Sequence, residues 1–335
     1  MIDHLPIQTS DRLSSLDTSV ATREALAINP ELTAQHRALL AAATSDNTRR
    51  TYRSAIRHFS AWGGELPCNE STVIRYLLAY APSLNPRTLA LRLTALSQWH
   101  VQQGFIDPAS TPTVRKTLAG IARVHGVPRK KAKALPVADL ERIVAHLTSL
   151  DSLVAKRDNA LLQIGYFGAF RRSEIVSLRV EHLAWEPEGI VLMLPRSKTD
   201  QQGEGMARAV PYGRGVCCPA SALRTWLAAA DINDGPLFRS ISKWHVVGPD
   251  ALHAGSVNSI LASCAKMVNL DYVPALSSHS LRRGMATSAH RAGASFRDIK
   301  RQGGWRHDGT VQGYIEEASQ FQENAAGSLL GGAKK

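Results

Sequence analysis

The chain has few cysteines, no long apolar run and a shortage of acidic residues, and each of these narrows the class of protein. Its four cysteines are Cys68, Cys217, Cys218 and Cys264, and no two of them have the two-residue gap typical of zinc knuckles and redox dithiols. We therefore expect reduced cysteines that serve as packing residues. No apolar stretch is long enough for a membrane-spanning helix, and the first residues lack the basic start and apolar stretch of a secretory signal. These features predict a cytosolic protein without a membrane partner.

The shortage of acidic residues makes the chain strongly basic. Its 335 residues include 28 Asp or Glu against 40 Lys or Arg, which gives a formal net charge of +12 and an isoelectric point near 9.8. Such a surface attracts polyanions, of which DNA and RNA are the commonest. A solvated basic face without a partner would have the same composition, so a prediction of nucleic-acid binding depends on where particular residues stand.

The chain is long enough for two domains, and its pattern predicts two helical domains joined by a basic linker. Residues 1–30 are polar and without periodicity, so we interpret them as a flexible arm. Residues 31–125 have the periodicity of helices throughout. Residues 126–136 contain two prolines, a glycine and four basic residues, which is typical of a linker, although a plain solvated loop would look similar. Residues 137–335 form the second predicted domain.

The first domain is predicted to be an all-α bundle. One helix lies within residues 46–64 and ends at Gly63. The next is expected to bury Val73, Ile74, Leu77 and Leu78. A third begins with Asn85 as its cap and ends at Gly104, and a fourth begins near Thr111.

The second domain is predicted to combine helices with a short antiparallel sheet. Residues 189–195 (GIVLMLP) are typical of a buried strand, and residues 208–212 (RAVPY) fit a partner strand across the intervening loop. Helical patterns lie on both sides of this hairpin. The predicted fold class is therefore mainly α (α+β), a helical N-terminal bundle followed by a mixed helical domain with a small antiparallel sheet.

Three residues around the hairpin are candidates for phosphate chemistry. Arg171 opens a predicted helix, and Glu174 lies one turn later on the same face. Lys198 stands at the end of the first predicted strand and is the only lysine of the hairpin. Taken alone, the first two would be a surface ion pair and the third a solvated turn lysine.

Four more candidates follow in the last sixty residues. His279 and Arg282 are three positions apart at the start of a predicted helix, so both can reach one anion near its positive end. Trp305 follows two glycines, and Tyr314 stands nine positions later. A chance His-x-x-Arg pair, a buried tryptophan and a core tyrosine would be the ordinary interpretations.

The order and spacing of the whole set resemble those of the tyrosine recombinase or phage integrase family. The set consists of Arg-x-x-Glu, a hairpin lysine, His-x-x-Arg, Gly-Gly-Trp and a tyrosine nine positions on. The resemblance extends over nearly the whole chain, and the helix around Arg87 and Arg92 is similar to one that this family lays against the major groove. It implies a site-specific DNA recombinase whose two domains form a C-shaped DNA clamp, with residues 31–125 as the core-binding domain and residues 137–335 as the catalytic domain.

The resemblance also implies a role for each candidate. Tyr314 would be the nucleophile that forms a 3′-phosphotyrosyl bond, and Arg171 and Arg282 would grip the phosphate. Lys198 would be the general acid for the departing 5′-oxygen, and His279 would hydrogen-bond the phosphate and help to manage the tyrosine proton.

The remaining two candidates would have supporting roles. Glu174 would orient the basic residues, and Trp305, which stands where many family members have histidine, would position groups without exchanging protons. No metal is implied, because no step requires one and no clustered carboxylates offer a magnesium site. No nucleotide cofactor is implied, because the phosphotyrosyl bond conserves the energy of the broken phosphodiester.

The implied partner is double-stranded DNA with an inverted-repeat target site, bound by four copies of the chain on two sites. Apolar residues after Tyr314 have roughly helical spacing and are similar to a tail helix that docks on the neighbouring copy; a tail packed on its own domain is the alternative. An accessory protein is possible. The expected DNA contacts are Arg49, Arg50, Arg87, Arg92, Arg129, Lys130 and Lys131.

Two other functions fit parts of the same pattern. A DNA-binding regulator with this fold would bind without strand cleavage, although it would be expected to have lost some of the catalytic set. A type IB topoisomerase would relax supercoils with similar residues but without pairing two sites. The sequence does not distinguish a protein for integration from one for excision or resolution.

Overall fold

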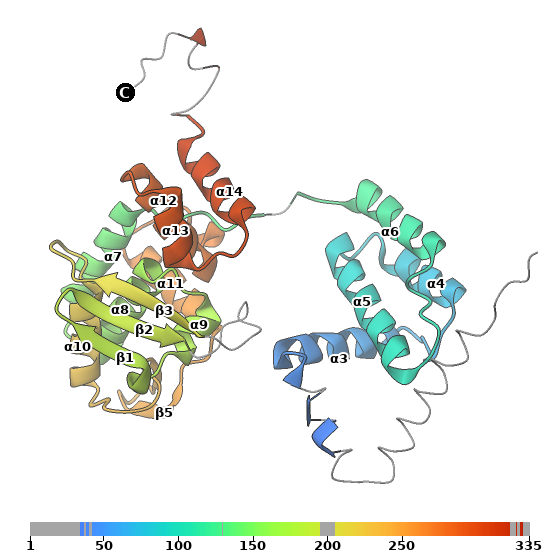
Figure 1. Ribbon diagram of the computed structural model, residues 1–335, viewed down its shortest axis with the longest axis horizontal. Coiled ribbons are helices and arrows are strands. Elements are labelled where there is room, and N and C mark those ends of the chain that lie inside the picture. The colour runs from blue at the N-terminus through green and yellow to red at the C-terminus, as the bar shows by residue number, and fades with distance from the viewer. Residues whose placement is uncertain are drawn as a thin grey trace, which may run out of the picture. The chain divides into compact units, whose positions relative to one another are not determined.

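The computed structural model describes residues 34–36, 38–39, 42–128, 130–194, 205–321, 326 and 329–330. The chain divides into two compact units, an N-terminal unit (Met1–Arg129) and a C-terminal unit (Lys130–Lys335), and each is described by itself (Figure 1). The predicted arm of residues 1–30, together with Arg129 and Lys198, lies outside the described residues.

The four helices predicted for the N-terminal unit are all present. They are α3 (Asp46–Ala61), α4 (Glu70–Tyr80), α5 (Pro86–Gln103) and α6 (Pro112–His125). Each begins at a residue whose side chain accepts a hydrogen bond from a backbone N–H of the first turn, and these caps are Ser45, Asn69, Asn85 and Thr111. α5 ends at Gly104, whose φ of 78° is easily reached only by glycine.

One prediction about the core of this unit is wrong. Val73 and Leu77 are fully buried as expected, but Leu78 is 56% exposed and Tyr76 is buried in its place. Residues three and four positions after Val73 lie on its face of α4, whereas a residue five positions later is turned well away from that face. Tyr76 therefore joins Phe59 and Leu96 in one apolar cluster of the bundle.

The C-terminal unit is mainly helical, as predicted, and its longest buried element is α8 (Leu153–Phe167). α8 packs against α7 (Val137–Thr148), α10 (Pro219–Ala229) and α12 (Ser278–Arg291) (Figure 1). Apolar side chains are buried around it because neighbouring elements cover it on several sides. The other helices of the unit are α9 (Arg172–Ser177), α11 (Ser256–Met267), α13 (Phe296–Gly303) and α14 (Asp308–Ser319), with short 3₁₀ turns at Val180–His182 and Val273–Ala275.

The predicted hairpin is confirmed as β2 (Gly189–Leu194) and β3 (Met206–Pro211), which pair antiparallel with Val191 opposite Ala209. β1 (Leu183–Glu186) adds a third strand on the other side of β2, in the order β1-β2-β3. A separate two-stranded sheet joins β4 (Arg239–Ile241) to β5 (Val247–Ala251). β1, β4 and β5 were not predicted, because they are short and largely exposed and so lack the apolar run that identifies β2.

The described residues of the predicted linker change from exposed to buried along the chain. Lys130 and Lys131 are exposed. Farther on, Leu135 is fully buried, and the backbone N–H groups of Lys133 and Leu135 donate to the carbonyl oxygens of Ala275 and Ser280 at 2.9 and 3.1 Å. The second half of the linker is therefore fixed to the C-terminal unit. In the described part of the chain no helix is both long and apolar enough to span a membrane.

Candidate active site

Arg171 and Glu174 lie at the turn between α8 and α9. Arg171 is the N-cap residue of α9, and the Glu174 carboxylate accepts from the Arg171 backbone N–H at 2.8 Å and from its Nη1 at 2.5 Å. Glu174 is only 4% exposed. The pair that the sequence placed on one face is thus brought together, and the carboxylate fixes the guanidinium beside a buried helix start.

Arg282 is buried in the second turn of α12 and faces the same region. Its Nη1 donates to the carbonyl oxygen of Ala169, and the centre of its guanidinium lies 4.2 Å from the centroid of the Trp305 ring. Burial, and after it the charge of Arg171, lowers the pKa of Arg282 to about 10, so the group stays positively charged at neutral pH. Ala169 has a φ of 49°, a left-handed conformation that costs an alanine about 1–2 kcal/mol.

The two glycines before Trp305 have a structural explanation. Gly303 ends α13, and a Cβ at this position would lie 1.8 Å from an atom of the Trp305 ring. Gly304 has a left-handed φ of 57°. Only this pair lets the chain turn sharply enough for the indole to fold back, and Trp305 is then 7% exposed.

Tyr314 lies on α14, with its ring against Trp305. The two ring centroids are 5.6 Å apart at an interplanar angle of 63°. Arg282 and Tyr314 therefore contact the same indole, and an ionised Tyr314 hydroxyl would raise the pKa of Arg282. The structure thus brings together a half-buried phenol and a buried guanidinium.

His279 lies on the first turn of α12, where its backbone N–H donates to the cap residue Ser277 at 3.3 Å. The residue is exposed, in contrast to Arg282 one turn later. An exposed imidazole at a helix N-terminus can reach a ligand that approaches from solvent.

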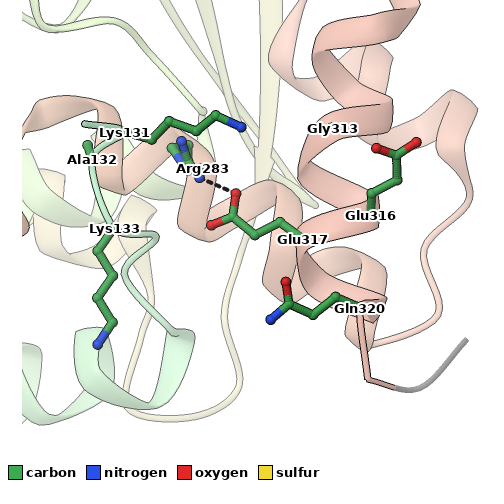
Figure 2. A pocket seen from close by; sticks show the side chains of 8 residues that line it. All are labelled: Lys131, Ala132, Lys133, Arg283, Gly313, Glu316, Glu317 and Gln320. Atoms are coloured by element: carbon green, nitrogen blue, oxygen red, sulfur yellow. Dashed lines mark hydrogen bonds and ion pairs between the residues drawn. The ribbon is translucent and has the colours of Figure 1, made fainter. Parts of the chain in front are cut away.

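Arg283, which was not among the predicted site residues, connects α12 to α14. It is 7% exposed and forms an ion pair with Glu317, and its guanidinium carbon lies 5.4 Å from the centroid of the Tyr314 ring. Figure 2 shows this pair at the edge of an open pocket of about 630 Å³, which is also lined by Lys131 and Glu316. The signal in the sequence was the second arginine of SLRR and an acidic residue three positions after Tyr314.

Arg208 on β3 was also missed. It is 3% exposed, and its Nη1 donates to the Arg301 carbonyl oxygen at 3.2 Å. Burial lowers its pKa to about 10, although the Glu174 carboxylate opposes this shift. Strand alternation could have revealed it, because Arg208 shares a face with the buried Val210.

The predicted DNA contacts in the N-terminal unit have different surroundings. Arg50 and Arg87 are exposed on α3 and α5, which pack against each other. Arg49 forms an ion pair with Asp46 on its own helix. Arg92 is half-buried, with Nη1 2.7 Å from a ring nitrogen of His58, and so takes part in the packing of α3 on α5.

Comparison with known proteins identifies the family of the chain. The model of the phage integrase family matches residues 133–320. The integrase/recombinase xerD homolog of Selenomonas ruminantium is 32% identical over 306 residues, which cover 89% of each chain. The recombinase cre of Escherichia phage P1 is 26% identical over 295 residues, 82% of this chain and 84% of that one. The chain belongs to the phage integrase family, and both relatives named here are recombinases.

Solved structures share the fold. The XerH site-specific recombinase, in a post-cleavage complex with a palindromic difH substrate, has a TM-score of 0.61 at 17% identity and covers 84% of this chain and 79% of its own. A lambda integrase (75–356) dimer bound to a COC′ core site has a TM-score of 0.58 at 14% identity, over 88% and 96% of the two chains. At these identities the likeness establishes the mainly helical fold with its small sheet.

Proposed function

We propose that this chain is a site-specific DNA recombinase that cleaves and rejoins DNA through a 3′-phosphotyrosyl intermediate. The observation that carries the proposal is the shared contact of Arg282 and Tyr314 with the Trp305 ring. In the proposed reaction Tyr314 is the nucleophile and Arg282 is a buried cation suited to a phosphate. Membership of the phage integrase family, with relatives named as recombinases, supports the same conclusion.

The site can supply each step of the exchange. The Tyr314 oxygen attacks the phosphorus, the bond from phosphorus to the 5′-oxygen breaks, and a 5′-hydroxyl leaves. A phenol with a pKa near 10 attacks poorly unless cations stabilise its anion, and Arg171 and Arg282 provide them. Both are planar forks that can donate two hydrogen bonds to phosphate oxygens as their charge grows.

Proton transfer involves two further groups. His279 accepts the proton of the Tyr314 hydroxyl from its exposed position on α12. Lys198, which lies outside the described residues, gives a proton to the departing 5′-oxygen. Attack by a 5′-hydroxyl of the partner DNA reverses the sequence and reseals the strand. Glu174 holds Arg171 in place through two hydrogen bonds.

The proposed substrate is double-stranded DNA with an inverted-repeat site. The proposed location of the protein is the cytoplasm. The exposed Arg50 and Arg87 contact the DNA from the N-terminal unit. Each of these cations releases condensed counterions when it meets a phosphate. The relatives XerH and lambda integrase, whose crystal structures contain their DNA sites, support this partner.

We also propose that four copies assemble on two sites through the tail that follows α14. Phe321, Leu329 and Leu330 are 86%, 88% and 85% exposed. Large apolar side chains exposed in one segment are typical of a surface that docks elsewhere. A head-to-tail contact with the next copy would close a ring.

Deletion of residues 321–335 tests this assembly. The truncated chain is expected to bind a single site within about threefold of the full chain, because the proposed DNA-contacting cations are retained, but to lose pairing of two sites. Gel-shift titration measures the first quantity, and the yield of recombinant product measures the second. Full recombination by the truncated chain would contradict the proposed contact.

Covalent trapping tests the proposed reaction itself. The protein is incubated with nicked DNA fragments from around its own gene and then denatured, and a protein–DNA adduct is expected for the wild type and not for Tyr314→Phe. Specific binding without an adduct would favour a regulator without strand cleavage. Relaxation of a supercoiled plasmid that lacks the trapped site would favour a topoisomerase.

A further inference from the structure

Arg208 is a buried cation with unused hydrogen-bonding capacity. Only 3% of the residue is exposed, and Nη1 alone is engaged, with the carbonyl oxygen of Arg301. Its Nε and Nη2 have no hydrogen-bond partner among the described residues. Leaving buried donors of a charged group unpaired is costly, so their retention indicates an acceptor that arrives with a ligand.

The position of Arg208 connects it to the proposed active site. Its Nη2 would lie 2.1 Å from a Cβ built at Gly304, so the guanidinium packs closely against the residue before Trp305. Arg282, against the Trp305 ring, also has an Nη2 without a partner in the described part of the chain. Two buried guanidiniums with unpaired donors therefore contact the same two-residue turn.

The charges of the reaction favour a further cation that stays charged throughout the step. A phosphodiester carries one negative charge, and attack by the phenolate brings a second, so the five-coordinate transition state carries two. Arg171 and Arg282 together with Glu174 leave a net single positive charge, and Lys198 loses its own charge with the proton that it gives to the leaving oxygen. Arg208 adds a cation that keeps its charge while negative charge develops on the phosphate.

We propose that Arg208 is a third phosphate-binding arginine, which donates through Nε and Nη2 to an oxygen of the scissile phosphate and balances the charge that develops during attack. This inference rests on the proposed function and adds a residue to it. An arginine suits the position because one guanidinium can keep the Arg301 carbonyl and still grip a phosphate oxygen with its other donors.

A neutral substrate isolates the charge effect. The duplex identified by trapping is prepared with the ordinary phosphate and with a methylphosphonate at the cleavage position, which keeps the phosphorus centre and removes its negative charge. Arg208→Gln is expected to slow adduct formation about 100-fold on the phosphate, the effect of losing one transition-state donor. On the methylphosphonate the loss is expected to be only a few-fold, because less charge needs balancing.

Matched controls separate this role from packing. Arg239→Gln removes another mostly buried arginine, which interacts with Asp234 in the region of β4, and should leave both rates unchanged. Equal losses on the two substrates for Arg208→Gln, or no loss on either, would overturn the proposal. Should Arg208→Gln fail to fold, Arg208→Lys serves instead: a flexible ammonium lacks the fork, so its loss should again be several-fold larger on the phosphate.

A second measurement does not depend on cleavage. Sulfate should raise the melting temperature of the wild type and of Arg239→Gln, because an oxyanion that binds only the folded state stabilises it. The increase should be at least halved in Arg208→Gln, and an undiminished increase would count against the inference. If the wild type forms no adduct, the proposed reaction fails, while the sulfate result still decides whether Arg208 binds an oxyanion.

Discussion

Trp305 is the residue that contacts both Tyr314, the proposed nucleophile, and the buried Arg282. Its indole contacts the Arg282 guanidinium on one hand and the Tyr314 ring on the other. A planar guanidinium can stack on a ring and still donate to a carbonyl oxygen, as Arg282 does to Ala169. In the proposed reaction Trp305 therefore supports catalysis by its position, because an indole N–H is a donor only and exchanges no proton.

Two substitutions at Trp305 should separate the effect of losing an aromatic face from the effect of losing side-chain volume. Trp305→Ala leaves a cavity beside Arg282 and Tyr314 and is expected to destabilise the chain by about 3–5 kcal/mol. Trp305→Phe retains an aromatic face and should cost about half as much, with a smaller loss of adduct. Urea unfolding and the trapping assay measure the two effects, and equal behaviour of both variants would contradict this role.

At the scale of elements, the contact between α12 and α14 determines the position of Tyr314, the proposed nucleophile. Arg283 forms an ion pair with Glu317, one turn after Tyr314, and packs over the tyrosine ring. Figure 2 shows Glu317 directed toward Arg283, whereas Glu316 points elsewhere along α14. The ion pair thus acts as a clamp between the helix of the arginines and the helix of the tyrosine.

Breaking the clamp should reduce cleavage more than DNA binding. Glu317→Arg places like charges together and is expected to slow adduct formation at least about tenfold, because a misplaced nucleophile loses much of its advantage. The exchange of both residues, Arg283→Glu with Glu317→Arg, should restore part of the rate. Glu316→Gln is the matched control and should match the wild type. Failure of the exchange to restore any rate would argue against the ion pair.

The packing of α3 on α5 contains a titratable contact. His58 of α3 lies beside Arg92 of α5, and burial, followed by the Arg92 charge, lowers the pKa of His58 below its usual 6.5. The unfolded chain therefore binds this proton more readily than the folded chain. Stability that is present above pH 6.5 is lost as the pH falls from 6.5 through the lower pKa of His58 in the folded chain.

Calorimetric unfolding between pH 8 and pH 5 should show this dependence. The wild type is expected to lose more stability over the range than His58→Gln, in which no proton can bind at this position. His125→Gln, a change at an exposed histidine of the same unit, should keep the wild-type slope. Equal slopes in all three proteins would contradict the role of His58.

At the scale of the whole molecule, the net charge of +12 determines how the chain meets DNA. The affinity should fall steeply with salt, because each contacted phosphate releases condensed counterions. Which arginines contribute depends on the fold, since Arg87 is exposed and Arg92 is held among His58 and Tyr76.

The salt dependence of binding distinguishes these two arginines. Arg87→Ala is expected to reduce the slope of log affinity against log salt by about one and to leave stability unchanged. Arg92→Ala should lower the melting temperature and alter the slope little. Fluorescence anisotropy at several salt concentrations gives the slopes, and the reverse pattern would show that Arg92 is the phosphate contact.

Local signals in the sequence were sufficient to predict the helices of the N-terminal unit and the hairpin of β2 and β3. Caps such as Asn85 and Thr111, the stop at Gly104 and the apolar run of β2 each act within a few residues, so their consequences follow from neighbours alone. The spacing of the set from Arg171 to Tyr314 identified the family in the same way. Leu78 was misplaced because a helix has several apolar positions, and packing chooses which of them face inward.

The sequence by itself determined the mainly helical fold class, the family and the candidate nucleophile, because periodicity and motif spacing are properties of the chain. Only the tertiary structure decided the surroundings of those residues. Arg208 and Arg283 come near the site through β3 and through the packing of α12 on α14, and Arg92, a predicted DNA contact, is half-buried beside His58. Such contacts join residues far apart in the chain, and burial then sets which cations need an anion.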